Sequence, residues 1–414
     1  MFSFRTHNKI PEIIEQIEAG LANDFKVIDD IALFNQEKAL RSFIDNKVAL
    51  RHFSQTTGYG YDDIGRDTLN SVYAGVFKSD SAIVSSHILS GTHAISLVLF
   101  GLLRPGNKLL SISGQPYDTL KDVISGKGLG SLADFDISYD EVPLCEGNFD
   151  KPAIKEKILA ERPQMVLIQR SRGYSLRNPL SCVQIRDICS FIKGLDERII
   201  IFVDNCYGEF TEKEEPIEAG ADVVAGSLIK NAGGGIAPNG GYIAGRGDLI
   251  DLINRRLTTP ATGGEIGSNF GGYQYFYQGL FLAPHVVAQS LKGALLMGEA
   301  MKWAGYKVLP EEPSQCYDII RSIEFDTEEE LITFCRTIQS VSPVDSYVVP
   351  YPWDMPGYKN KVIMAAGCFV QGSSIELSCD APVRPPYVAY CQGGLTYEHV
   401  KIAVIHCLQN LKKL

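Results

Sequence analysis

The stretch RIIIFVDNCYGEFTEKEEPIEAGADVVAGSLIKNAGGGIAPNGGYIAG (198–245) decides the fold class of this 414-residue chain. It contains three short apolar runs: RIIIFVD (198–204), DVVAGSL (222–228) and GYIAG (241–245). Apolar runs without strict alternation are typical of strands that are buried on both faces. Three more runs precede them, separated by helical segments: AIVSS (82–86), KLLSIS (108–113) and QMVLIQ (164–169). Strands that alternate with helices predict an α/β domain with a largely parallel sheet.

Two further parts flank this region. Apolar residues near a period of 3.6 predict helices over residues 9–50. Beyond about 290, the pattern predicts a helix (290–304), three strand-like segments and a final helix from about 396. The strand-like segments are IRSIEF (320–325), VIMAAGCFV (362–370) and SIELS (374–378). We therefore expect a helical N-terminal segment (1–50), a large α/β domain (51–290) and a smaller C-terminal α+β domain (291–414).

The charge and the apolar pattern exclude several classes of partner. The chain has 39 Lys and Arg and 49 Asp and Glu, and its net charge of −10 argues against binding to nucleic acid or to anionic membrane surfaces. The longest apolar-leaning stretch, 93–103, has 11 residues, about half of the roughly 20 that a membrane-spanning helix needs. The N-terminus has no basic-then-apolar signal, so we expect a cytoplasmic protein.

The ten cysteines are scattered and form no C-x-x-C pair, and no H-E-x-x-H occurs among the seven histidines. Zinc sites and disulfide-rich secreted domains both show closer spacings. We expect reduced thiols that behave as small apolar residues, and no metal site.

Ligands of open α/β sheets bind beyond the carboxyl ends of the strands, so the residues that end each run are of interest. Asp204 ends one run, and Lys230 follows the next one beside a glycine-rich turn. A lysine at this place is expected to be desolvated, with a lowered pKa suited to nucleophilic or Schiff-base chemistry. An acid and an amine at neighbouring strand ends are what pyridoxal phosphate requires: the lysine binds it covalently and the acid keeps its ring nitrogen protonated. Taken singly, such a lysine can be structural and such an aspartate a turn or helix cap.

Two further signals accompany this pair. Ser90, Gly91 and Thr92 precede a helical run, where free N–H groups, hydroxyls and the helix dipole can bind a phosphate. A plain helix cap is the alternative for these three residues. Tyr117 follows the run KLLSIS and is available to stack on a ring, although a lone loop tyrosine can equally be a surface residue.

Together these residues resemble a fold-type I pyridoxal-phosphate enzyme of the cystathionine/methionine lyase class. Within that class the chain resembles the methionine gamma-lyase-like, or aluminium resistance protein, family over roughly residues 50 to 410. Five segments carry the resemblance: TGYGYDDIGRDTL (57–69), SGTHA (90–94), VDNCYGEF (203–210), GSLIKNAGGGIAPNGGYIAG (226–245) and FVQGSSIELSCDAPVRPPY (369–387). The resemblance implies an aspartate aminotransferase-type large domain with a mainly parallel sheet, and a smaller C-terminal domain.

The resemblance also assigns roles to residues at matching positions. Lys230 would be the Schiff-base lysine, Asp204 the partner of the pyridine nitrogen and Tyr117 the residue that stacks on the ring. The phosphate would be held by Ser90, Gly91, Thr92 and Ser227.

In related lyases, a tyrosine and an arginine from the neighbouring subunit reach the phosphate. Tyr59 or Tyr61 with Arg66 would be their equivalents here, which implies a homodimer or homotetramer with an active site shared across the interface. A glycine-rich surface loop with two tyrosines is the alternative.

For the substrate, Arg384 in the proline-rich segment APVRPP (381–386) is the candidate partner of the α-carboxylate. Ser374, in the GSS segment (372–374), is a candidate hydrogen-bond donor nearby. The basic residues Arg170, Arg172 and Arg177 are interpreted as a group that could attract an anionic cofactor or select an acidic substrate. Two residues are left open: Asn178 could contact the cofactor, and His93 could contact it or simply start a helix.

The expected activity is elimination from a sulfur-containing amino acid, as in a cystathionine beta-lyase or a methionine gamma-lyase. Lys230 would act as the base at the α-carbon, with Tyr117 assisting a second proton shift during γ-elimination. The products would be a keto acid, ammonia and a thiol. Transamination, racemisation, γ-replacement and a non-catalytic role as a pyridoxal-phosphate-binding stress-resistance protein stay open. The exact substrate is not predicted.

Overall fold

The computed structural model describes residues 9–355 and 360–411, so the first eight residues of the expected N-terminal segment and the last three of the C-terminal domain lie outside the described ranges. Within these ranges, seven strands form a large sheet in the order β1-β7-β6-β5-β4-β2-β3. The strands are β1 (Ser81–Ser85), β2 (Lys108–Ser111), β3 (Ser138–Glu141), β4 (Met165–Gln169), β5 (Ile200–Asp204), β6 (Val223–Ser227) and β7 (Gly241–Gly245). Only β7 runs antiparallel to its neighbours, so the mainly parallel sheet is confirmed.

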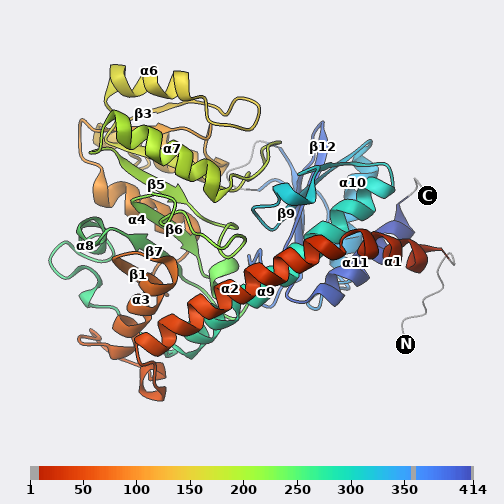
Figure 1. Cartoon of the computed structure of the whole chain (residues 1–414), viewed down its shortest axis with the longest axis horizontal. Helices are drawn as coiled ribbons and strands as arrows, with labels where there is room; N and C mark the ends of the chain where they lie inside the picture. The colour runs from red at the N-terminus through yellow and green to blue at the C-terminus, as the bar shows by residue number, and fades with distance from the viewer. Residues whose placement is uncertain (1–8, 356–359, 412–414) are drawn as a thin grey trace.

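Helices cover both faces of the large sheet (Figure 1). One face carries α3 (Ile64–Phe77), α6 (Lys151–Glu161) and α7 (Cys182–Leu195), and the other carries α4 (Gly91–Leu102), α5 (Asp118–Ser125) and α8 (Gly247–Asn254). Strand β5 contacts the helices on both faces: Ile201 and Val203 lie in the core beneath α3, α6 and α7, and Ile200 and Phe202 lie in the core beneath α4, α5 and α8. A strand buried on both sides is apolar at every position, which is the pattern its sequence shows.

A smaller sheet follows in the chain, in the order β10-β11-β12-β9-β8, with antiparallel neighbours throughout. Its strands are β8 (Lys307–Leu309), β9 (Ile320–Phe325), β10 (Val362–Ala365), β11 (Ser378–Pro382) and β12 (Tyr387–Gln392). One face packs on α1 (Ile10–Gly20), α10 (Glu328–Ser340) and α11 (Tyr397–Asn410). The other face is turned toward the large sheet, where Tyr390 packs against Tyr174 and Tyr207.

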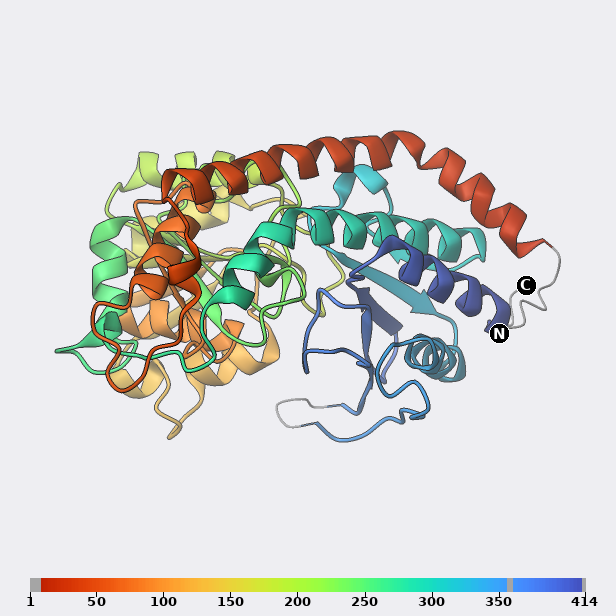
Figure 2. The ribbon, with the colours of Figure 1, turned by 90° about the horizontal axis from the view of Figure 1, so that it is seen from below.

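Two long helices, α2 (Ala22–Asp45) and α9 (Gln274–Trp303), lie side by side and extend from the large sheet to the small one (Figures 1 and 2). The helix expected over 290–304 is therefore longer, and the expected boundary at 290 lies inside α9. By length and composition α9 could cross a membrane, contrary to the expectation that no segment is long enough, but 72% of its apolar window is buried inside the protein. Its apolar residues contribute to two cores, that of the large sheet up to Leu295 and that of the small sheet from Leu296 on.

The segment SIELS (374–378) is not a strand, contrary to expectation: only Ser378 belongs to β11. Residues 374–377 form a turn instead of pairing with a strand. The Glu376 carboxylate in this turn accepts hydrogen bonds from the backbone N–H groups of Phe369 (2.8 Å) and Val370 (2.9 Å). Gly393 also approaches so closely that a Cβ there would lie 2.2 Å from the carbonyl oxygen of Glu376. This turn brings Ser374 toward the large domain.

Candidate active site

The strand ends of the large sheet bring Asp204 and Lys230 into one neighbourhood. Asp204 ends β5 and is in register with Ala225 of β6, and Lys230 follows the end of β6 by three residues. The ammonium nitrogen Nζ of Lys230 lies 4.0 Å from the centroid of the Tyr207 ring. Asp204 is buried, and its Oδ1 accepts a hydrogen bond from the N–H of Cys206 at 3.1 Å.

The electrostatics of this pair differ from the expectation. Burial lowers the pKa of Lys230, but the acidic groups of Cys206, Tyr207, Asp204 and Tyr117 outweigh burial and raise the pKa well above its usual value. The expected lowered pKa is therefore wrong for the chain alone, because that expectation rested on burial and left out the opposing effect of the acidic groups around the ammonium. Burial raises the pKa of Asp204, and the charge of Lys230 opposes that shift.

Tyr117 lies at the start of α5, close to this pair. Its hydroxyl is 3.0 Å from Oγ1 of Thr92, and its backbone N–H donates to Oε1 of Gln169 at 3.2 Å. Burial raises the pKa of the Tyr117 hydroxyl, and the charge of Asp204 raises it further. The structure thus brings Tyr117, Thr92 and Asp204 together, as the sequence predicts.

The N-terminus of α4 meets the ends of β5 and β6. Ser90 caps the helix, because its Oγ accepts from the N–H of His93 at 3.1 Å. A Cβ on Gly91 would lie 3.1 Å from Sγ of Cys206 and 3.5 Å from Cβ of Ser227. Ser227 is 1% exposed, and its Oγ has no hydrogen-bond partner. A helix N-terminus beside a buried, unpaired hydroxyl matches what a phosphate group needs.

The sequence did not single out Tyr207 and Gln169. Tyr207 adopts a left-handed backbone conformation (φ 71°), and its hydroxyl lies 3.2 Å from Oγ of Ser374, so Ser374 lies beside this neighbourhood. The role of Ser374 toward a substrate stays a prediction. Gln169 is in register with Asp204 on the adjacent strand. The positions of both residues near strand ends could have indicated them, since Gln169 ends β4 and Tyr207 comes three residues after Asp204.

The predicted subunit-contact residues lie elsewhere on the chain. Tyr59 and Tyr61 are 69% and 58% exposed, with ring centroids 5.6 Å apart. Arg66 is buried, and its Nη1 donates to the carbonyl oxygens of Gly60 (3.1 Å) and Glu265 (3.2 Å). Their role toward a neighbouring subunit stays a prediction.

Arg384 lies in the exposed turn between β11 and β12. Its charge acts on Tyr390, where it lowers the pKa of a hydroxyl that burial raises to about 12. Tyr390 packs on the same small-sheet face that meets Tyr207. Its role toward a substrate carboxylate stays a prediction.

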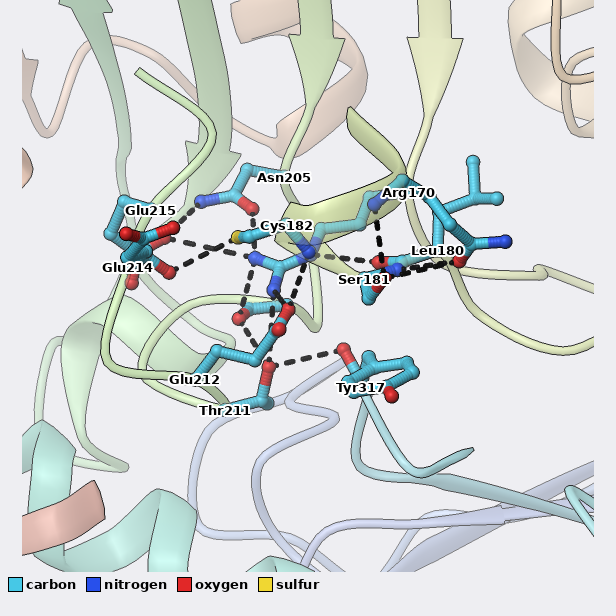
Figure 3. A network of polar contacts seen from close by, with 12 residues as sticks. Arg170, Leu180, Ser181, Cys182, Asn205, Thr211, Glu212, Glu214, Glu215 and Tyr317 are labelled. Atoms are coloured by element: carbon cyan, nitrogen blue, oxygen red, sulfur yellow. Dashed lines mark hydrogen bonds and ion pairs between the residues drawn. The ribbon is translucent and has the colours of Figure 1, made fainter. Parts of the chain in front are cut away.

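The basic segment is structural, contrary to the expectation that it attracts an anionic ligand. Arg170 and Arg172 are both 0% exposed. Figure 3 shows the Arg170 guanidinium, which donates to Oδ1 of Asn205 (2.8 Å) and Oε2 of Glu212 (2.7 Å). Arg172 pairs with Asp318 at 3.4 Å. The Arg170 guanidinium is thus occupied by partners within the chain, and Arg172, whose Nε has no hydrogen-bond partner, is fully buried.

The remaining open residues also have partners within the chain. Arg177 donates to the carbonyl oxygens of Gln169 (2.7 Å) and Ser171 (2.8 Å). Asn178 donates to Oε1 of Gln315 at 2.8 Å, and Nδ1 of His93 accepts from the N–H of Leu89 at 3.1 Å.

All ten cysteines are free thiols. In the part of the chain that the structure describes, no group of three or more His, Cys, Asp or Glu side chains is arranged to hold a metal ion.

Comparison with known proteins gives a consistent result. The family model described as methionine gamma-lyase matches residues 10–412. The uncharacterised protein YnbB of Bacillus subtilis is 47% identical over 416 residues, which cover 99% of each chain. The solved structure of a proposed cystathionine beta-lyase involved in aluminium resistance, from Listeria monocytogenes, is 49% identical with a TM-score of 0.95, covering 97% of this chain and 100% of that one. A carbon–sulfur lyase involved in aluminium resistance, from Clostridium novyi, is 48% identical with a TM-score of 0.94, covering 97% and 96%.

A more distant structure shows the fold alone. The pyridoxal-5'-phosphate-dependent protein YhfS of Escherichia coli is 17% identical with a TM-score of 0.64, covering 93% of this chain and 97% of that one. The expected fold, a type I large domain with a smaller C-terminal domain, is thereby confirmed.

Proposed function

Because the chain belongs to the methionine gamma-lyase family, we propose that it is a pyridoxal-phosphate-dependent carbon–sulfur lyase acting on a sulfur-containing amino acid. The observation that carries the proposal is the position of Lys230, whose ammonium lies on the Tyr207 ring at the strand ends where Asp204 and the start of α4 meet. The sequence identity to carbon–sulfur lyase relatives over almost the whole chain supports it.

The residues present fit pyridoxal phosphate. Its phosphate would be held at the N-terminus of α4 by Ser90, Gly91 and Thr92, with the unpaired hydroxyl of Ser227 as an additional donor. Asp204 is a buried carboxylate that would pair with a protonated ring nitrogen. Tyr117, held by Thr92 and Gln169, would lie against the ring. When bound, the cofactor draws electrons away from the substrate α-carbon.

Two side chains of the protein, Lys230 and Tyr117, would carry out the proton transfers. Once the substrate's amine has taken its place on the cofactor, Lys230 would be left as a free amine, able to take the proton from the α-carbon and to return it later. In the chain alone its ammonium lies 4.0 Å from the centroid of the Tyr207 ring, so Tyr207 lies beside the position of this base. Tyr117, whose hydroxyl lies 3.0 Å from Oγ1 of Thr92, would assist a second proton shift during γ-elimination. The carbon–sulfur bond breaks, sulfur leaves as a thiol, and water replaces nitrogen to give a keto acid and ammonia.

We further propose that the protein works as a homo-oligomer. Tyr59 and Tyr61, both exposed, would reach the phosphate of a neighbouring subunit, with Arg66 behind them. Such an arrangement makes the site complete only between two copies of the chain.

The test is a screen of the purified, cofactor-loaded protein with cystathionine, methionine and cysteine. We expect a keto acid, ammonia and a thiol in equal amounts from at least one of them, and none from the Lys230→Ala variant. Pyruvate as the product indicates β-elimination and 2-oxobutyrate indicates γ-elimination. A loaded protein that releases no keto acid from any of the three, or that converts the amino acid to its keto acid without releasing a thiol, contradicts the proposal.

A further inference from the structure

One face of the small sheet carries polar side chains that the proposed chemistry does not use. Along β11, Cys379 and Ala381 point into the hydrophobic core, so Ser378 and Asp380 lie on the opposite face. On β12, Gln392 is in register with Ser378, and Tyr390 is in register with Asp380. Four polar side chains therefore share a face that the core does not cover.

This face meets the candidate active site through tyrosines. The Tyr390 ring lies 5.0 Å from the Tyr174 ring, and its hydroxyl donates to the carbonyl oxygen of Tyr174 at 2.6 Å. Tyr174 and Tyr207 both pack on the apolar patch that includes Tyr390. Since the Lys230 ammonium lies on the Tyr207 ring, the face adjoins the reacting groups.

Asp380 is a carboxylate without a dedicated counterion. Gln392 donates to its Oδ2 at 3.3 Å and the Tyr174 side chain also hydrogen-bonds to it, and both are neutral groups. Burial raises the pKa of Asp380 to about 6, and the cation that opposes this shift is Lys230. No lysine or arginine in 9–355 or 360–411 forms a salt bridge with Asp380. Under the proposed function Lys230 serves the cofactor and the α-carbon, so the described residues leave Asp380 free to pair with a cation brought by a ligand.

Ser378 gives a second, independent sign of a missing ligand. It is 3% exposed, and its Oγ has no hydrogen-bond partner. A buried hydroxyl without a partner is unfavourable by about 1–3 kcal/mol, so native structures rarely keep one. It lies two residues from Asp380 on the same strand and face, where a polar ligand would satisfy it.

We propose that Asp380, with the Tyr174 and Tyr390 rings beside it, binds a second ammonium group of the substrate, carried on the part that leaves with sulfur. This inference rests on the proposed function and narrows its substrate class to amino-acid thioethers with an amine at the far end. A carboxylate flanked by aromatic rings is the arrangement that selects an ammonium. The substrate's own α-amine is required beside Lys230, so the ammonium at Asp380 is a second one.

The test uses two unreactive mimics that contain a methylene group in place of sulfur. 2,7-Diaminosuberate has ammonium groups at both ends, and 2-aminosuberate lacks the distal one. Calorimetric titration of the cofactor-loaded wild-type protein measures both affinities without any elimination. We expect the diamino compound to bind on the order of tenfold more tightly, the increment of one charge-assisted hydrogen bond.

The variants separate recognition from folding. Asp380→Asn keeps the size of the side chain and is expected to bring the two affinities within about threefold of each other. Asp380→Glu keeps the charge and should restore part of the preference. Asp251→Asn removes a charge from an exposed position on α8 and should leave the preference intact. Thermal melting of each variant checks that it folds.

Equal binding of the two mimics to the wild-type protein, or an undiminished preference in Asp380→Asn, overturns the inference. Keto acid release from cystathionine, measured in parallel, reports on the proposed function separately. Elimination without a binding preference removes only the role of Asp380. A binding preference without keto acid from cystathionine leaves Asp380 as an ammonium-binding residue but contradicts its place in cleavage of such thioethers, and the screen with methionine and cysteine then decides on the lyase activity itself.

Discussion

Arg170 joins the end of β4 to the loop after β5 from a fully buried position. Its guanidinium pairs with Glu212 at 2.7 Å and lies 3.7 Å from Glu215, which is itself fully buried. Its backbone N–H donates to the carbonyl oxygen of Asp204 at 3.1 Å. Arg170 thereby fixes the strand end that carries the acid of the candidate site.

Replacing Arg170 with alanine leaves two carboxylates without their cation in a low-dielectric interior. We expect the free energy of unfolding to fall by about 3–5 kcal/mol, measured by urea denaturation. The matched control is Arg198→Ala, since Arg198 pairs with Asp196 at 2.7 Å but its side chain is 87% exposed. No measurable loss is expected there. Equal losses in the two variants would show that burial of the Arg170 network does not matter.

Residue identity alone predicted part of the candidate site. Asp204 and Lys230 were predicted because each stands at or just after the end of a buried strand, and the sheet brings those ends together; Ser227 was predicted from the family resemblance. Asp380 was missed because its partners, Tyr174 and Gln392, come from other segments, and only the packed domains place them near Lys230. Arg170 was misread for the same reason: its carboxylate partners lie more than forty positions along the chain.

At the level of elements, the start of α4 serves both the fold and the proposed phosphate site. Ser90 accepts from the N–H of His93, and its own O–H stays available to donate. Ser181 caps α7 in the same way, accepting from the N–H of Gln184 at 3.2 Å, but it is not among the residues proposed to hold the cofactor. The two serines form a natural matched pair.

Ser90→Ala and Ser181→Ala should each lower the free energy of unfolding by about 1 kcal/mol, because each removes one helix cap. Only Ser90→Ala should also weaken the binding of pyridoxal phosphate, on the order of tenfold, through loss of one hydrogen bond to a charged group. Fluorescence titration of cofactor-free protein measures the affinity. The same loss of affinity in both variants would mean that α4 has no special role.

The elements themselves were predicted well where the sequence pattern is local. Strands β5 and β6 and the final helix follow from apolar runs and periodicity, and they form where expected. The segment 374–377 has strand-like composition, but Glu376 bonds to backbone N–H groups instead of leaving them to a ladder. Helix α9 begins at Gln274, well before the expected start at 290, because burial of its apolar residues in the folded protein, and not the local sequence pattern, decides its length.

In the molecule as a whole, α2 and α9 lie side by side and connect the two sheets (Figure 2). The small-sheet face with Asp380 thereby lies close to the strand ends with Lys230. Tyr59 and Tyr61 are exposed and contact each other, and they have no role in the site of a single chain. In the proposed homo-oligomer they would contact the cofactor of the neighbouring subunit.

Subunit mixing tests that proposal. A Lys230→Ala chain and a Tyr59→Ala/Tyr61→Ala chain are each expected to have little activity. If sites are shared across a two-fold interface, co-refolded mixtures contain intact sites built from the tyrosines of one chain and the lysine of the other. About a quarter of the wild-type activity should return in a random mixture of dimers. No recovery in a mixture shown to contain hybrids would place the whole site in one chain.

The central claim is that Lys230 binds pyridoxal phosphate covalently at the strand ends beside Asp204. The most direct measurement is borohydride reduction of the cofactor-loaded protein, followed by mass spectrometry of its peptides. We expect a visible absorption band that reduction removes, with the reduced cofactor on the peptide that contains Lys230, and neither result for Lys230→Ala. Attachment to a different lysine, or an unchanged band in Lys230→Ala, would contradict it.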